Sequence, residues 1–180
     1  MPRTSLTSRN FNSRWKALRR PYQHVAPKPW RRWLTDRGSL TQHLIRASHG
    51  HFRVEVVQQG FAKPSLSEAR ALSISPRQRT LIREVQLIGD GTPWVFARTV
   101  IPVTTLTGRQ RQLHHIGNRS LGTILFRDPT MRRGPLQISC LKDQLGQQMW
   151  ARRSVFWLQN KPLLVAEVFL PPLQQVEYSP

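Results

Sequence analysis

The chain has 180 residues, with 28 Lys and Arg against nine Asp and Glu, so its formal net charge is +19 and its isoelectric point is near 11.9. This balance attracts anions such as nucleic acid, membrane surfaces or small carboxylates, while an apolar fraction of 38% with six Trp excludes a disordered chain. A single cysteine, Cys140, excludes a disulfide framework, and no apolar run is long enough for a membrane span, so we expect a cytoplasmic protein.

Residues 1–32 are predicted to be a basic N-terminal extension, followed by one domain over residues 33–180. The extension contains nine basic residues and no acidic one. Residues 14–20 favour a short basic amphipathic helix that ends before Pro21 and would bind phosphates or a membrane surface. The alternative is a solvated terminus that packs Trp15 or Trp30 on the domain.

The predicted elements of the domain alternate between short helices and strand pairs. A helix capped by Asp36 or Ser39 and ended by Gly50, with apolar positions from Leu40 to Ala47 on one side, is followed by a strand over residues 52–57. Two strands within residues 80–101 are joined by the turn at residues 89–92, whose Gly and Asp tolerate positive φ. A helix over 104–116, a helix or turn over 121–126, a strand near 136–138 and a hairpin of 151–158 with 163–170 complete the chain. The pattern predicts an α+β fold with a single antiparallel β-sheet and helices packed on one side.

Two arginines lie on apolar faces of the central hairpin. Alternation of strand side chains places Arg83 with Leu81, Val85 and Leu87, and places Arg98 with Trp94, Phe96 and Val100. If Ile88 pairs with Pro93 or Trp94, the two arginines lie near each other across the ladder. An inward guanidinium needs an anion, which is either an internal Glu or the carboxylate of a ligand.

Glu167 is the one charged residue in the apolar run from Leu163 to Leu170. It is either a structural partner of Arg83, Arg98 or Arg152, or part of a cavity for a ligand with an anionic end and a hydroxyl end. The pairs Arg132-Arg133 and Arg152-Arg153 are interpreted as exposed charge. No HExxH, CxxC or paired-Asp motif is present, so no metal site is predicted.

Several ordered motifs between Trp33 and Pro171 resemble the chorismate pyruvate-lyase family of bacterial enzymes. The motifs are Trp33-Leu34, Gly38 to Thr41, Gly60-Phe61, Leu81 to Glu84, Asp90 to Trp94, Ala97 to Pro102, Ser120 to Phe126, Trp150 to Ser154 and Lys161 to Pro171. The resemblance implies a monomeric enzyme that needs no cofactor. It converts chorismate to 4-hydroxybenzoate and pyruvate, the first committed step of ubiquinone biosynthesis, and retains its product tightly.

The resemblance also implies roles for five residues. Arg83 and Glu167 are the expected catalytic residues, Arg83 binding the ring carboxylate and Glu167 the 4-hydroxyl group. The backbone N–H of Leu121 assists with the carboxylate, and the backbone of Leu40 contacts the ligand. Arg98 is assigned to the enolpyruvyl carboxylate.

Two other functions are compatible with the sequence. The same fold resembles the effector-binding domains of some bacterial transcription regulators, which bind small acids without turnover. The second alternative, a basic nucleic-acid-binding protein, is supported by charge alone. The sequence lacks the aromatic and glycine signatures of common RNA-binding modules, so nucleic-acid binding is not expected.

Overall fold

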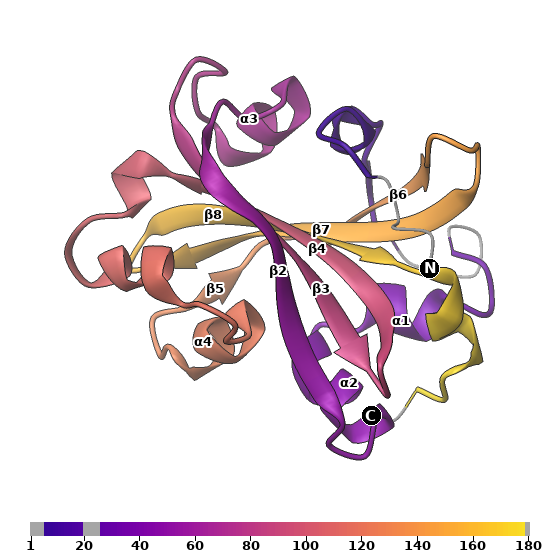
Figure 1. Cartoon of the computed structure of the whole chain (residues 1–180). Helices are drawn as coiled ribbons and strands as arrows, with labels where there is room; N and C mark the ends of the chain where they lie inside the picture. Colours follow the sequence, from indigo (N-terminus) through magenta and orange to yellow (C-terminus); the bar gives the residue numbers. More distant parts are fainter. Residues whose placement is uncertain (1–5, 20–25, 179–180) are drawn as a thin grey trace.

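The computed structural model describes residues 6–19 and 26–178, which form one strongly twisted antiparallel sheet (Figure 1). The order of the strands is β1-β6-β7-β8-β4-β3-β2, and β5 pairs with β7 beside this path. Their bounds are β1 Lys16–Ala17, β2 Phe52–Ala62, β3 Thr80–Gly89, β4 Thr92–Pro102, β5 Arg132–Arg133, β6 Gln137–Lys142, β7 Gln148–Leu158 and β8 Lys161–Phe169. The predicted α+β class with a single antiparallel sheet is confirmed.

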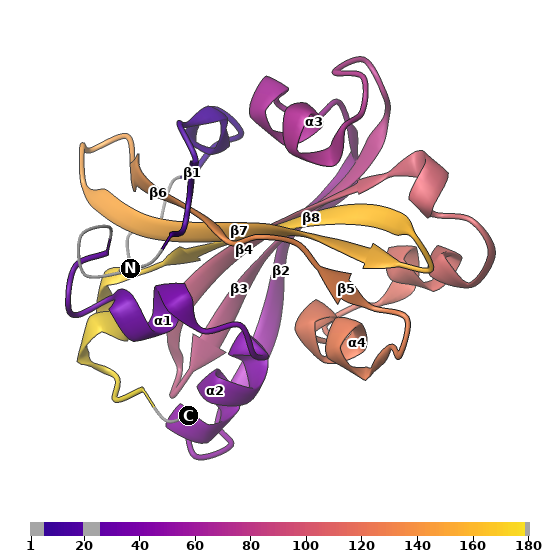
Figure 2. The same ribbon diagram turned by 180° about the vertical axis from the view of Figure 1, so that it is seen from behind.

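One face of the sheet is covered by α1 (Arg31–Thr35), α2 (Leu40–Ala47) and α4 (Leu121–Arg127), as both views show (Figures 1 and 2). Buried side chains of these helices pack on β3, β4, β7 and β8 in two apolar clusters. The helix α3 (Leu66–Leu72) and the 3-10 turn η1 (Asn10–Asn12) lie across part of the opposite face. We refer to these as the cavity face and the far face, because an apolar cavity lies under α2 and α4.

Serine side chains begin the α-helices that matter most for the site. Ser39 accepts a hydrogen bond from the backbone N–H of Gln42 at the start of α2, and Ser120 does the same for Thr123 in α4. Both helix starts were predicted. The helix α3 was not predicted, although Ser65 and Glu68 form a capping box that the sequence contains.

The predicted helix over residues 104–116 is wrong. The chain forms two 3-10 segments instead, η3 (Val103–Thr105) and η4 (Gly108–His115), and a third, η5 (Pro171–Gln175), follows β8. Gly108, the first residue of η4, has a φ of 56°, a left-handed conformation that interrupts a continuous helix.

Both predicted hairpins are present, and each turns on two residues with positive φ. These are Asp90 and Gly91 between β3 and β4, and Gln159 and Asn160 between β7 and β8. Such turns match the right-handed twist of the two strands that they join, so they favour a hairpin at each of these positions.

One extra residue in β4, Trp94, changes which side chains share a face. Ile88 pairs with Pro93, which is one of the two pairings named above. The next pair is Leu87 with Val95, so Trp94 has no partner residue in β3. Its indole packs against Gly89, where an added Cβ would lie 2.1 Å from the ring. A one-residue bulge moves every later side chain of the strand to the other face.

The register beyond this bulge separates the two arginines. Arg83 lies opposite Thr99 on the cavity face, whereas Arg98 lies opposite Glu84 on the far face. The expectation that Arg83 and Arg98 lie together on one side is therefore wrong, because it assumed an unbroken ladder.

The described part of the N-terminal residues is packed on the sheet. Lys16 and Ala17 pair with β6, so the helix predicted over residues 14–20 is absent from its described residues 14–19. Phe11 is buried on the far face, and the guanidinium of Arg153 stacks on Trp15. The boundary between residues 32 and 33 stays a prediction.

Candidate active site

The cavity lies between the sheet and the first turns of α2 and α4. Most of its lining is apolar, including Val85, Leu121 and Phe156, and its charged lining residues are Arg83 and Glu167. Its volume is about 50 Å³. The structure thus brings the two predicted catalytic residues to one chamber from different strands, β3 and β8.

Arg83 is buried without a carboxylate partner. Its guanidinium donates hydrogen bonds to Gln59 Oε1 (3.2 Å), to the carbonyl oxygen of Gly117 (2.7 Å) and to that of Arg119 (3.3 Å). None of the ion pairs among the described residues includes Arg83. Burial lowers the pKa of the guanidinium, but neutral acceptors leave its positive charge uncompensated. An anion that enters the cavity would supply the missing charge.

Glu167 combines the two roles that the sequence left open. Its Oε2 accepts a hydrogen bond of 2.6 Å from Nε of Arg152, and the same side chain borders the cavity. Arg152 is held in place by donating to the carbonyl oxygens of Trp33 and Asp36. A carboxylate has about four acceptor positions, so the pair with Arg152 leaves capacity for a ligand hydroxyl.

The site also includes the two main-chain positions implied by the resemblance. Leu40 and Leu121 are the first residues of α2 and α4, and both line the cavity. The two helix starts are joined by a 2.6 Å hydrogen bond between the hydroxyl groups of Thr41 and Ser120. Gly122 makes this approach possible, because an added Cβ would lie 2.8 Å from the Thr41 hydroxyl. α2 and α4 therefore close the cavity together.

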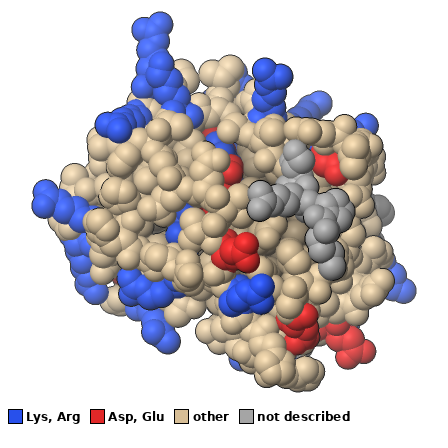
Figure 3. Space-filling model, in the orientation of Figure 1, with Lys and Arg blue, Asp and Glu red and all other residues tan. Residues whose placement is uncertain are grey.

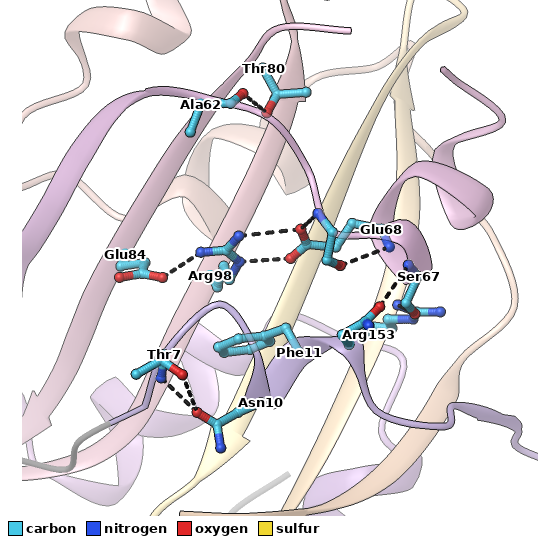
Figure 4. A network of polar contacts seen from close by, with 12 residues as sticks. Thr7, Asn10, Phe11, Ala62, Ser67, Glu68, Thr80, Glu84, Arg98 and Arg153 are labelled. Atoms are coloured by element: carbon cyan, nitrogen blue, oxygen red, sulfur yellow. Dashed lines mark hydrogen bonds and ion pairs between the residues drawn. The ribbon is translucent and has the colours of Figure 1, made fainter. Parts of the chain in front are cut away.

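Arg98 is not part of this site. On the far face it donates to both carboxylate oxygens of Glu68, the closer at 2.7 Å, and to Glu84 (Figure 4). Burial alone would lower the pKa of Arg98, but these two carboxylates raise it. The sheet separates Arg98 from the cavity, so its assignment to the enolpyruvyl carboxylate is not supported.

Three of the arginines interpreted as exposed charge are buried or half-buried. Arg152 is 1% exposed and Arg153 is 6% exposed, while Arg133 is partly covered and Arg132 alone is exposed. Arg152 and Arg153 are neighbours on β7, so one side chain enters each face of the sheet. In the sequence two adjacent arginines are typical of an exposed segment, because the groups that they bind lie in distant segments and cannot be recognised there.

Residues 6–19 and 26–178 contain neither a cluster of metal ligands nor a helix that could cross a membrane. Nowhere in residues 6–19 and 26–178 do three His, Cys, Asp or Glu side chains gather as a metal site would require. Among the helices of the same residues, none is both long and apolar enough to cross a membrane.

The fold is shared with solved structures of low sequence identity. The crystal structure of PhnF from Mycobacterium smegmatis matches with a TM-score of 0.54 at 13% identity, covering 77% of this chain and 66% of that one. The ligand-binding domain of a putative GntR-family transcriptional regulator from Bordetella bronchiseptica gives a TM-score of 0.50 at 12% identity, covering 73% and 88%. These matches define the class of fold, a single-sheet α+β domain.

Sequence comparison gives the family. The family model described as chorismate lyase matches residues 12–177. A probable chorismate pyruvate-lyase from Marinobacter nauticus is 46% identical, over 82% of this chain and 79% of the relative. One from Nitrosomonas europaea is 40% identical, over 84% and 92% respectively. The chain belongs to the chorismate lyase family, as its motifs predicted.

The position of Arg98 predicts a structural role that can be measured. Replacing Arg98 with Ala leaves the carboxylates of Glu68 and Glu84 buried without their partner, so the free energy of unfolding should fall by about 3–5 kcal/mol. Arg83→Ala removes a buried charge that has no carboxylate partner, so it should cost less than half as much. Urea denaturation of both variants tests this, and equal losses would contradict the assignment of Arg98 to the structure.

Proposed function

We propose that this member of the chorismate lyase family converts chorismate to 4-hydroxybenzoate and pyruvate in the cavity between Arg83 and Glu167. One observation carries the proposal. An uncompensated guanidinium and a carboxylate with spare acceptor positions face the same apolar chamber from separate strands. That arrangement suits a ring with a carboxylate at one end and a hydroxyl group at the other.

The residue roles follow from this placement and from the family resemblance. Arg83 binds the ring carboxylate, assisted by the backbone N–H of Leu121. Glu167 accepts a hydrogen bond from the 4-hydroxyl group, and Arg152 holds the Glu167 carboxylate in position. The backbone of Leu40, at the start of α2, contacts the ligand. Arg83 and Glu167 are the proposed catalytic residues.

The reaction requires no group beyond the substrate. The C3–O bond breaks, the side chain leaves as the enolate of pyruvate with the bonding electrons, and C4 loses its hydrogen as a proton. The methylene carbon of the enolate then gains a proton to give pyruvate, and the ring becomes aromatic. Holding the side chain over the ring contributes to the rate by orientation, an effect that can amount to several kcal/mol.

Entry of the substrate requires the cavity to enlarge. A volume of about 50 Å³ is too small for an aromatic ring, because a cavity that holds benzene has about 150 Å³. The starts of α2 and α4, joined through Thr41 and Ser120, are the parts that would separate. The same closure would retain 4-hydroxybenzoate after pyruvate has left.

We further propose that the protein acts as a monomer in the cytoplasm and supplies 4-hydroxybenzoate for ubiquinone. These statements rest on the family resemblance. The excess of positive charge agrees with capture of a dianionic substrate.

Lyase activity is tested by release of 4-hydroxybenzoate from chorismate. Arg83→Ala and Glu167→Ala should each fold and lose about 10- to 100-fold in kcat/KM, because a hydrogen bond to a charged group contributes about 1.5–3 kcal/mol. The exposed residues Arg53 and Glu55 on β2 provide the matched controls Arg53→Ala and Glu55→Ala. Full activity of the Arg83→Ala protein would contradict the assignment of the active site to this cavity.

Product retention is tested separately. Because Arg83 and Glu167 bind groups present in both substrate and product, 4-hydroxybenzoate release should limit turnover. Stopped-flow mixing with chorismate should then show a burst of about one 4-hydroxybenzoate per site before the steady state. A linear time course from the first turnover would contradict this prediction.

The two alternative functions give different results in the same experiments. A non-catalytic sensor would bind 4-hydroxybenzoate or chorismate without releasing pyruvate. A nucleic-acid-binding protein would be retained on DNA or RNA in moderate salt. On the face shown in Figure 3, Lys and Arg project around most of the outline instead of forming one stripe, which does not favour the second alternative.

A further inference from the structure

The proposed substrate carries a second carboxylate, on its enolpyruvyl side chain, and the residue predicted for it lies on the wrong face. Arg98 is separated from the cavity by the sheet and is bound to Glu68 and Glu84. Arg83 is placed for the ring carboxylate at the other end of the chamber. A cation for the second carboxylate must therefore come from another element on the cavity face.

Arg133 on β5 reaches this face beside the cavity. Its Nε donates to the hydroxyl oxygen of Ser154 (3.1 Å), and Ser154 is paired across the ladder with Val165, a lining residue. The guanidinium carbon lies 5.1 Å from the ring centre of Phe156, which also lines the cavity. Arg133 does not line the cavity itself, but it lies against the lining residue Phe156 on the β7 side.

The contacts of Arg133 place it next to the Arg152–Glu167 pair. Nη1 of Arg133 donates to the carbonyl oxygen of Arg37 (2.9 Å), and Nη1 of Arg152 donates to the carbonyl oxygen of Asp36 (2.6 Å). The two guanidinium groups therefore hold adjacent carbonyl groups of the loop that precedes α2. This brings Arg133 to the end of the cavity where Glu167 would bind the 4-hydroxyl group.

The charge at this end is not balanced. Glu167 is the ion-pair partner of Arg152, and no ion pair among the described residues includes Arg133. Burial, and then the nearby charge of Arg152, lower the pKa of Arg133 to about 10, so the group stays protonated at neutral pH. The charges that act on Arg133 are the cations Arg152 and Arg37 and the carboxylates Glu167 and Asp36, so together with Arg133 itself one positive charge remains for an incoming anion.

We propose that Arg133 binds the enolpyruvyl carboxylate of chorismate, an inference that rests on the proposed lyase function. In chorismate the side chain is attached at C3, next to the C4 hydroxyl group and away from the ring carboxylate. A ring held by Arg83 at one end and by Glu167 at C4 therefore places the side chain on the Glu167 side of the cavity. The dianion spans two uncompensated guanidinium groups, Arg83 and Arg133.

With Arg133 in this role, the site distinguishes chorismate from 4-hydroxybenzoate. 4-Hydroxybenzoate retains the ring carboxylate and the hydroxyl group but has lost the side chain, so it makes no contact with Arg133. Arg83 acts on both molecules, whereas Arg133 acts on chorismate alone. Loss of pyruvate leaves Arg133 without its anion.

The test compares Arg133→Gln with Arg132→Gln, a change at the exposed neighbour on the same strand, whose side chain bonds Asn160. Arg133→Gln should lower kcat/KM for chorismate about tenfold or more, because a charge-assisted hydrogen bond is lost. The Kd of 4-hydroxybenzoate, measured by calorimetry, should change less than about twofold. Arg133→Lys, which keeps the charge, should recover part of the loss, and Arg132→Gln should match the wild type.

Each other outcome decides against the inference. Equal kcat/KM for Arg133→Gln and Arg132→Gln would overturn it and leave the lyase function standing. A parallel loss of 4-hydroxybenzoate affinity would assign Arg133 to support of the loop at Arg37 instead of to the substrate. A wild-type chain that releases no 4-hydroxybenzoate would overturn the proposed function itself.

Discussion

The extra residue at Trp94 decides which charges meet on each side of the sheet. Without it, Arg83 would lie opposite Arg98, and two guanidinium groups would compete for the same carboxylates. With it, Arg98 turns to the far face, where Glu68 and Glu84 neutralise it, and Arg83 is left on the cavity face with neutral acceptors. The bulge in the β3–β4 hairpin is therefore the reason that the cavity has the positive charge of Arg83 at one end.

Buried arginines on the two faces serve different purposes because their partners differ. The carboxylates around Arg98 and the neutral groups around Arg153 form a polar network, and α3 supplies one partner to each arginine, Glu68 to Arg98 and Ser67 to Arg153. On the cavity face, Arg152 is paired with Glu167, whereas Arg83 and Arg133 have only neutral acceptors. Positive charge that the protein does not neutralise is concentrated at the two ends of the chamber, which suits a dianion.

Much of this arrangement could be predicted from the sequence, and the failures have physical causes. Alternation and turn residues gave both hairpins, and the inward positions of Arg83 and Glu167 followed from the apolar runs around them. The bulge could not be predicted, because Trp94 fits either register until its packing on Gly89 is known. Arg133 and Arg152 looked like surface charge, since the carbonyl groups that they bind belong to a loop almost 100 residues or more away.

We propose that one ring is held between Arg83 and Glu167 on the cavity face, and a crystal structure of the chain with 4-hydroxybenzoate would decide this. We expect the ring in the chamber under α2 and α4, with its carboxylate within hydrogen-bonding distance of the Arg83 guanidinium and its hydroxyl group on Glu167. A product molecule bound on the far face, or reversed so that its carboxylate approaches Glu167, would contradict it.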